Sequence, residues 1–160
     1  TLRPIAESFA VPYHLLPVEP DNKRAQETRV RELLREAQVD LVVLARYMQI
    51  LSPEFVREYD GRIINIHHGF LPAFKGSRPY HRAWARGVKI IGATAHYVTD
   101  ALDEGPIIAQ DVISVSHQHS VSAMIERGRD IERRVLLEAV QAHLAHRIII
   151  HESRTVIFHP

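Results

Sequence analysis

The sequence contains no cysteine, which removes disulfides, thiolate metal sites and cysteine nucleophiles from the functions open to this 160-residue chain. A cysteine-free composition fits a cytoplasmic protein. The formal net charge is only +1, so charge indicates neither a nucleic-acid partner nor an anionic membrane. No apolar run approaches the roughly 20 residues of a membrane-spanning helix. The start, Thr1-Leu2-Arg3-Pro4, has no signal-peptide pattern and no initiator methionine, and we therefore expect a piece of a longer protein.

Motifs of two common enzyme classes are also missing. The chain has no Gly-x-Ser-x-Gly elbow, so nucleophilic serine catalysis has little support. It has no His-Glu-x-x-His either, although it contains eleven histidines. A zinc site made by His67, His96 and Asp103 stays open as an alternative, but no ligand spacing supports it. The neighbours His67 and His68 are not expected to bind one ion together, because adjacent strand residues face opposite sides.

The first half of the chain alternates between helical and extended patterns. A helix is predicted from Asp21 or Asn22 to Gln38. The run 40–45 is apolar and β-branched without alternation, which predicts a parallel strand buried on both faces. Ser52-Pro53 then reads as the cap and first position of a short helix, and a strand carrying Asn65 follows. Such a succession is typical of an α/β protein with a parallel sheet.

The remaining segments complete one predicted domain over residues 1–160. We expect the end of a helix and a short strand within residues 1–18, a helix from Pro79 to Ala85 stopped by Gly87, strand-like runs at 89–98 and 107–115 that pair as a hairpin, a long helix from Ser120 or Ser122 to His146, and a terminal β-hairpin over 147–158. Gly92, inside the first of the two strand-like runs, marks a bulge or a close backbone approach.

Polar side chains gather at predicted strand ends. Asn65 and His67 fall on one face where their strand stops, His96 comes late in the next strand, and Asp103 lies in the following loop. Ligands of open α/β sheets bind beyond the carboxyl ends of the strands. An amide, an imidazole and a carboxylate there are able to polarise a carbonyl, hold a water and move a proton.

Two further stretches invite a binding interpretation. The segment after residue 45 is mostly apolar although it follows a strand end, which suits the wall of a pocket for a flat aromatic ligand as well as ordinary packing. Lys75-Gly76, together with Arg78, is able to bind an anion, but it is too short for a phosphate loop, and a surface loop explains it equally well.

Taken together, these residues resemble the folate-dependent formyl-transfer family. The resemblance rests on Asn65-Ile66-His67, Leu71-Pro72, Lys75-Gly76, His96-Tyr97-Val98 and Leu102-Asp103-Glu104-Gly105-Pro106-Ile107-Ile108. The match is closest to the hydrolytic branch, because His67-His68 stands where transferring members usually have His-Pro, and because of the long run 87–98. Position 69 departs from the family, which usually has Ser where this chain has Gly; only a loop hydrogen bond is placed in doubt.

The resemblance implies a fold and a larger protein. The expected fold is a mostly parallel Rossmann-like sheet of the formyltransferase type with a C-terminal β-hairpin, lacking its first strand–helix unit. An ACT-type domain is expected upstream of this catalytic domain.

The resemblance also implies an activity, the hydrolysis of 10-formyltetrahydrofolate to tetrahydrofolate and formate, which supplies formate to purine biosynthesis. No cofactor or metal is implied, and a cytoplasmic homo-oligomer with a small folate substrate is expected. The catalytic positions match Asn65, His67 and Asp103. The substrate-binding positions match Leu44, Tyr47, Met48, Gln49, Ile50, Leu51, His96, Thr99, Asp100 and Leu102. A formyltransferase acting on glycinamide ribonucleotide and an inactive folate-binding module stay open as alternatives.

Overall fold

The computed structural model describes residues 2–19, 21–73 and 78–159, which fall into two compact units, residues 1–39 and 40–160. The first unit contains α1 (Arg3–Ser8) and α2 (Lys23–Glu36). Asn22 precedes α2 as predicted, but its side chain accepts a hydrogen bond from the Glu19 backbone N–H at 2.8 Å and does not cap the helix. The strand expected within residues 1–18 is wrong: residues 11–19 have no regular secondary structure, and none of the described strands pairs with them.

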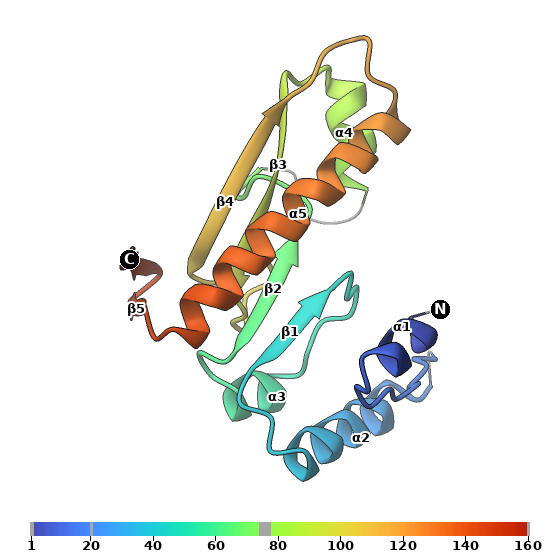
Figure 1. The fold of residues 1–160 in the computed structure, drawn as a ribbon, viewed down its shortest axis with the longest axis vertical. Coiled ribbons are helices and arrows are strands. Elements are labelled where there is room, and N and C mark those ends of the chain that lie inside the picture. Colours follow the sequence, from blue (N-terminus) through green and yellow to red (C-terminus); the bar gives the residue numbers. More distant parts are fainter. Residues whose placement is uncertain (1, 20, 74–77, 160) are drawn as a thin grey trace. The chain divides into compact units, whose positions relative to one another are not determined.

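The second unit is built on a four-stranded sheet in the order β1-β2-β3-β4 (Figure 1). The strands are β1 (Val42–Ala45), β2 (Ile63–His67), β3 (Ile90–Tyr97) and β4 (Ile107–Ser114). β1 and β2 are parallel, whereas β2–β3 and β3–β4 are antiparallel. The α/β class is confirmed, with a mixed sheet in place of the mostly parallel one expected. The connection over residues 98–106 is too short for a crossover, which needs a dozen residues or more, so β4 has to return antiparallel to β3.

β1 differs from its expected burial on both faces. Val42 is buried, but the next side chain, Val43, is 40% exposed. Among the described residues, β1 pairs with β2 alone and its burial alternates.

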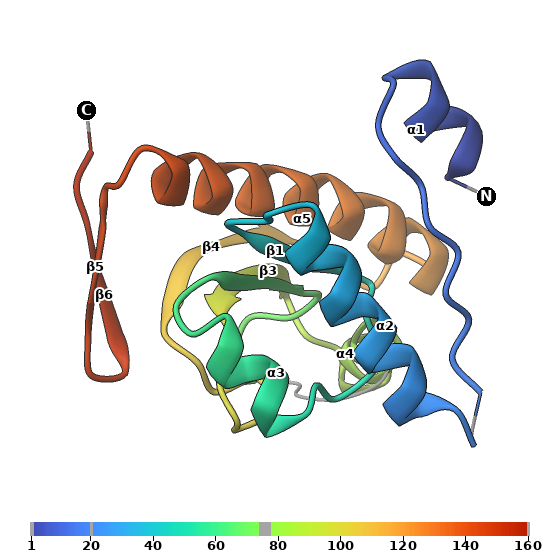
Figure 2. The same ribbon diagram turned by 90° about the horizontal axis from the view of Figure 1, so that it is seen from below.

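The long helix α5 (Val121–Leu144) covers one face of the sheet, as Figure 2 shows. It packs mainly against β3 and β4. Every second residue of β3 points into this interface and is almost fully buried, and the helix adds a matching apolar stripe. These residues are Ile91, Ala93, Ala95 and Tyr97 from β3, and Met124, Ile131, Val135 and Ala139 from α5. The small side chains of Ala93 and Ala95 let the helix approach the sheet closely. The alternate residues of β3 face the opposite side of the sheet.

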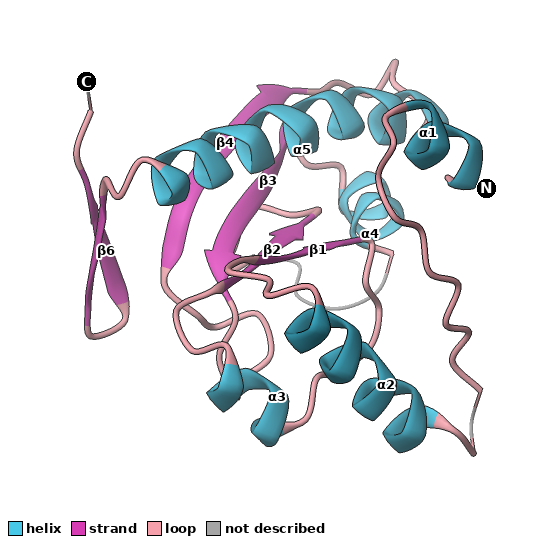
Figure 3. Ribbon diagram, turned by 60° about the horizontal axis from the view of Figure 1, so that its bottom comes forward, coloured by secondary structure: helices cyan, strands magenta, loops and turns pink. Residues whose placement is uncertain are grey.

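Shorter elements confirm the predicted helix boundaries. Ser52 caps α3 (Pro53–Glu58), and its side chain accepts a hydrogen bond from the Phe55 backbone N–H at 3.2 Å. α4 (Pro79–Arg86) begins at its proline and ends at Gly87, which has a φ of 69° that favours glycine. The predicted terminal hairpin is present as β5 (Ile148–His151) and β6 (Arg154–Ile157), seen beyond the end of α5 in Figure 3. No described helix is long and apolar enough to span a membrane.

The cap of α5 resolves the choice between Ser120 and Ser122. The Ser120 hydroxyl accepts a hydrogen bond from the Ala123 backbone N–H at 3.2 Å, whereas Ser122 lies inside the first turn. We expect Ser120→Ala to lower the free energy of unfolding by about 1 kcal/mol, because it leaves that N–H without its partner. Ser122→Ala is the matched control and should change it by less than about 0.5 kcal/mol. Denaturant unfolding measures both, and equal effects would contradict the assignment.

Candidate functional site

Two adjacent strands bring three of the predicted polar residues together. Asn65 and His67 alternate onto one face of β2, and His96 of β3 lies directly opposite Asn65 in the antiparallel register. The Asn65 amide nitrogen is 3.2 Å from Nε2 of His96. Residues paired across strands share a face, so this cluster occupies the side of β3 that α5 does not cover. The sheet itself therefore fixes the spacing of the three side chains.

The backbone sets the tautomer of His96. Its Nδ1 lies 2.8 Å from the Tyr97 carbonyl oxygen, which only accepts hydrogen bonds, so Nδ1 carries the proton. Burial lowers the pKa of His96, although the Tyr97 hydrogen bond and the nearby Asp103 carboxylate both act to raise it. Nε2 is then an acceptor, and the Asn65 amide N–H donates to it. The orientation of the Asn65 amide follows from this one backbone contact.

Asp103 approaches the cluster from the loop between β3 and β4. Its carboxylate oxygens lie 3.4 Å from Nδ1 of His67 and 3.7 Å from Nε2 of His96. Asp103 has a φ of 55°, a left-handed conformation that non-glycine residues rarely adopt. Two residues later, a Cβ at Gly105 would overlap the Tyr97 carbonyl, so only glycine fits there. The loop thus reaches the site through close packing on the end of β3.

The turn after β2 holds His67 from its other edge. A Cβ at Gly69 would lie 3.0 Å from Nε2 of His67, so the turn packs directly on that ring and Nδ1 is the nitrogen that faces Asp103. The departure from the family at Gly69 therefore bears on the His67 ring, and not merely on a loop hydrogen bond as expected.

Thr94 and Gln110 anchor this turn, and the sequence-based prediction missed both. The Thr94 hydroxyl donates to the Gly69 carbonyl at 2.8 Å and accepts from the Leu71 N–H at 3.0 Å. The Gln110 amide donates to the Thr94 hydroxyl at 2.9 Å and to the Leu71 carbonyl at 3.0 Å. Thr94 precedes His96 by two residues and so shares its face of β3; this spacing is the signal that would have found it.

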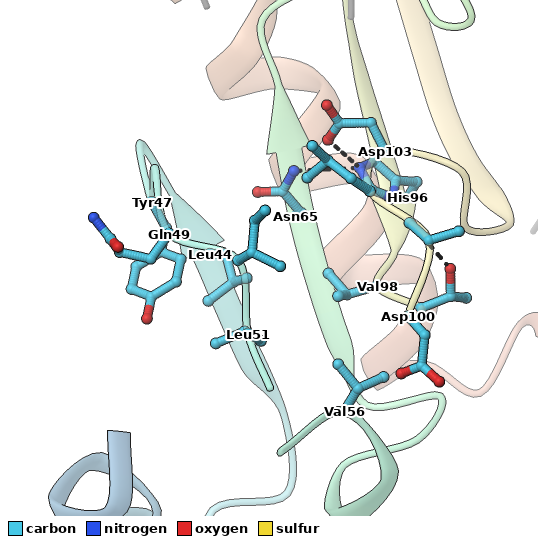
Figure 4. A pocket seen from close by; sticks show the side chains of 14 residues that line it. Leu44, Tyr47, Gln49, Leu51, Val56, Asn65, His96, Val98, Asp100 and Asp103 are labelled. Carbon is cyan, nitrogen blue, oxygen red and sulfur yellow. Dashed lines mark hydrogen bonds and ion pairs between the residues drawn. The ribbon is translucent and has the colours of Figure 1, made fainter. Parts of the chain in front are cut away.

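A cavity of about 70 Å³ opens beside the cluster (Figure 4). Figure 4 shows Leu44 and Leu51 on the β1 side, Asp100 and Asp103 on the loop side, and Asn65 between them. Nearly all of the predicted substrate-binding residues line it: Leu44, Tyr47, Gln49, Ile50, Leu51, His96, Thr99, Asp100 and Leu102. Two lining residues were not predicted: Val56 and Val98.

A second cavity, of about 270 Å³, continues from the first. The two cavities share Tyr47, Gln49, Ile50, Asn65, Leu102 and Asp103. His67, His68 and the predicted Met48 line only the second cavity of these two. The polar cluster therefore stands where a narrow, mostly apolar space meets a wider one. Such a place suits a ligand with a flat end and a reactive centre beside it.

His67 and His68 lie on the same side, contrary to expectation. Their rings are stacked, with centroids 5.8 Å apart. β2 ends at His67, so the alternation of a strand no longer applies to the next residue. Among the described residues, no three His, Cys, Asp or Glu side chains are placed to hold a metal ion. The geometry gives the zinc alternative no support. Lys75 and Gly76, considered for anion binding, lie outside the described residues.

Comparison with known proteins gives consistent matches. Residues 4–140 match the family model described as formyl transferase. The chain is 58% identical over 157 residues to a protein named formyltetrahydrofolate deformylase from Synechocystis sp., covering 98% of this chain and 55% of that protein. It is 52% identical over 156 residues to the protein of that name from Bacillus subtilis, covering 98% and 52%. The chain thus spans about half the length of the curated relatives it matches.

Solved structures agree with these sequence matches. A formyltetrahydrofolate deformylase from Pseudomonas syringae pv. tomato superimposes with a TM-score of 0.96 at 51% identity, covering 99% of this chain and 53% of that chain. A phosphoribosylglycinamide formyltransferase from Anaplasma phagocytophilum superimposes with a TM-score of 0.89 at 33% identity, covering 98% and 76%. The formyltransferase type of fold is therefore confirmed.

The tautomer of His96 is open to direct measurement. At pH 6.5, where an ordinary histidine is half protonated, we expect the His96 ring to be neutral with its proton on Nδ1, as read from ring ¹⁵N chemical shifts. The unfolded chain binds more protons than the folded one below that pH, so the contribution of His96 to stability falls as the pH is lowered through 6.5. Imidazolium shifts at pH 6.5 would contradict this.

Proposed function

The chain belongs to the formyl transferase family, and we propose that the protein carrying it hydrolyses 10-formyltetrahydrofolate to tetrahydrofolate and formate. The observation that carries this proposal is the convergence of Asn65, His67 and Asp103 at the junction of two cavities. The names of the relatives at 50–58% identity support water as the acceptor; the structure named as a formyltransferase is 33% identical.

The substrate would lie with its pterin ring in the smaller cavity. Leu44, Ile50 and Leu51 supply an apolar wall there, and the loop over residues 99–102 closes the other side. The formyl group on N10 would then lie at the junction, beside Asn65. Its bond to nitrogen is weakened because the nitrogen is conjugated with the benzoyl ring, so the reaction does not require a metal ion.

The proposed chemistry uses three groups. Asp103 positions a water and accepts its proton as the oxygen attacks the formyl carbon. The Asn65 amide and the Nδ1–H of His67 donate hydrogen bonds to the oxyanion that forms; one such donor is typically worth about 3–4 kcal/mol. The carbon–nitrogen bond then breaks, Asp103 returns the proton to N10, and formic acid ionises to formate. Each proton and oxygen comes from the attacking water or the substrate.

His96 acts through Asn65 in this proposal. Because neutral His96 accepts one N–H of the Asn65 amide, the amide cannot rotate to present its oxygen in place of its nitrogen. The second N–H of Asn65 is thus held ready for the oxyanion. Such preorganised donors need no reorientation during the reaction.

Three expectations about the protein stay predictions. We propose that it acts in the cytoplasm, which the cysteine-free composition of this chain fits, and that it carries no resident cofactor. We also propose a homo-oligomer. The outer face of the β5–β6 hairpin supports this, because Ile149, Val156 and Phe158 are 54%, 49% and 52% exposed.

Substitution of Asp103 tests the proposed mechanism. We expect Asp103→Asn to lower the turnover number for formate release by at least about 10²-fold, because the amide cannot accept the proton of water. Folate affinity, measured by equilibrium binding, should change little. Glu104→Gln makes the same chemical change one residue along, at an exposed position, and should retain near-normal turnover. The assays use the whole protein, with and without a chelator.

Each result has a clear meaning. Near-normal turnover in Asp103→Asn would overturn the assignment of the base. Folate binding with no formate release by the unaltered protein would identify an inactive binding module. Loss of formate release on chelation would point to the metal hydrolase instead.

A further inference from the structure

A third cavity, of about 320 Å³, lies beyond the junction and is strongly basic. Arg46 from the end of β1, Arg78 from the start of α4 and Arg129 from α5 all line it. The proposed hydrolysis uses none of these guanidinium groups. Glu132 is the one carboxylate among the residues lining this cavity, so the three arginines leave an excess of two positive charges there.

The three guanidinium groups have no carboxylate partner among the described residues. Elsewhere in the same unit, arginines do pair: Arg57 lies 3.5 Å from Glu54, and Arg133 lies 3.3 Å from Asp130. Glu132 is already engaged, because its carboxylate accepts a hydrogen bond from the Tyr80 hydroxyl at 2.7 Å. Three positively charged side chains therefore surround this cavity, and no carboxylate of the described residues forms an ion pair with them.

The pKa of Tyr80 reflects the charges of two arginines, Arg46 and Arg129, that come from separate elements. Burial raises the pKa of Tyr80, the Glu132 hydrogen bond raises it further, and the charges of Arg129 and Arg46 both lower it. Two guanidinium groups, one after β1 and one on α5, thus lie close enough to act on a single hydroxyl. That hydroxyl is fixed in place, since it packs on Gly128, where a Cβ would overlap it.

The basic cavity adjoins the proposed reaction site. Arg46, Met48 and His68 line both this cavity and the one that contains Asn65, His67 and Asp103. Arg46 stands at the boundary in a left-handed conformation, with a φ of 53°. Arg78, on the far side, has the same φ. The arginine-lined cavity therefore adjoins the space in which the substrate is proposed to bind.

We infer that the cavity lined by Arg46, Arg78 and Arg129 binds a carboxylate during the reaction. The inference rests on the proposed function, because that reaction brings carboxylates from two sources: the glutamyl tail of the folate, and the formate that is released. Guanidinium groups bind carboxylates through paired, charge-assisted hydrogen bonds. Met48 and His68 would flank the benzoyl ring or the path of the formate between the two cavities.

The double variant Arg46→Gln/Arg129→Gln tests the inference in the whole protein. Three measurements are made: the KM for 10-formyltetrahydrofolate, the KM for its glutamyl diamide, and inhibition by added formate. If the tail is bound, the KM for the carboxylate substrate rises about tenfold and the KM for the diamide stays unchanged. If formate is bound, its inhibition constant rises about tenfold while both KM values stay unchanged.

A matched control and a binding measurement complete the test. Arg133→Gln removes the same charge from α5 outside the cavity and should leave all three constants unchanged. Calorimetric binding of tetrahydrofolate and of formate to the unaltered protein and the double variant needs no turnover. Arginine-dependent binding without formate release would overturn the proposed function alone. If the double variant matches the unaltered protein in every constant and in binding, the carboxylate site is overturned.

Discussion

The hydrogen bond from His96 to the Tyr97 carbonyl is the constraint on which the candidate site depends. It fixes the His96 tautomer, and through it the direction in which Asn65 presents its amide. The same Tyr97 carbonyl is packed by Gly105, and the Tyr97 N–H donates to the Pro106 carbonyl at 2.9 Å. The backbone of one residue at the end of β3, Tyr97, thereby positions both the proposed oxyanion donor and the loop that carries Asp103. The apolar face of β3 secures this strand end against α5.

The arrangement explains how one fold is able to serve either hydrolysis or transfer. The polar groups act on the formyl carbon in the same way whether water or an amine attacks it. Selection must then come from the space around the junction. Here that space leads to Arg46 and Arg129, whose charges attract carboxylates.

The sequence predicted those features that depend on neighbouring residues. Ser52-Pro53, Pro79 with Gly87, and Ser120 mark helix ends by local chemistry, and the structure confirms each of them. The gathering of Asn65, His67, His96 and Asp103 into one cluster was also anticipated. The family resemblance identified most of the cavity wall, which apolar character alone left open between a pocket and ordinary packing.

Features that depend on pairing between distant segments were not predictable in this way. The hairpin of β3 and β4 was predicted, but the antiparallel pairing of β2 with β3 and the hydrogen bonds of Thr94 and Gln110 follow from strand register, which hydrophobic pattern does not specify. His68 was expected on the side opposite His67, because the alternation of side chains along a strand was extended one residue too far. β2 ends at His67, and tertiary contacts set that end. Residues 11–19 have the composition of a strand, but a strand needs a partner to form.

The fate of the formyl group tests the central claim most directly. The whole protein would be given 10-formyltetrahydrofolate in the presence and absence of glycinamide ribonucleotide, and formate and formylated amine would be quantified. We predict equal formate release in both cases and no formylated amine, because water is the acceptor in the proposed reaction. Formyl transfer to the amine, with no formate released in its absence, would contradict the account.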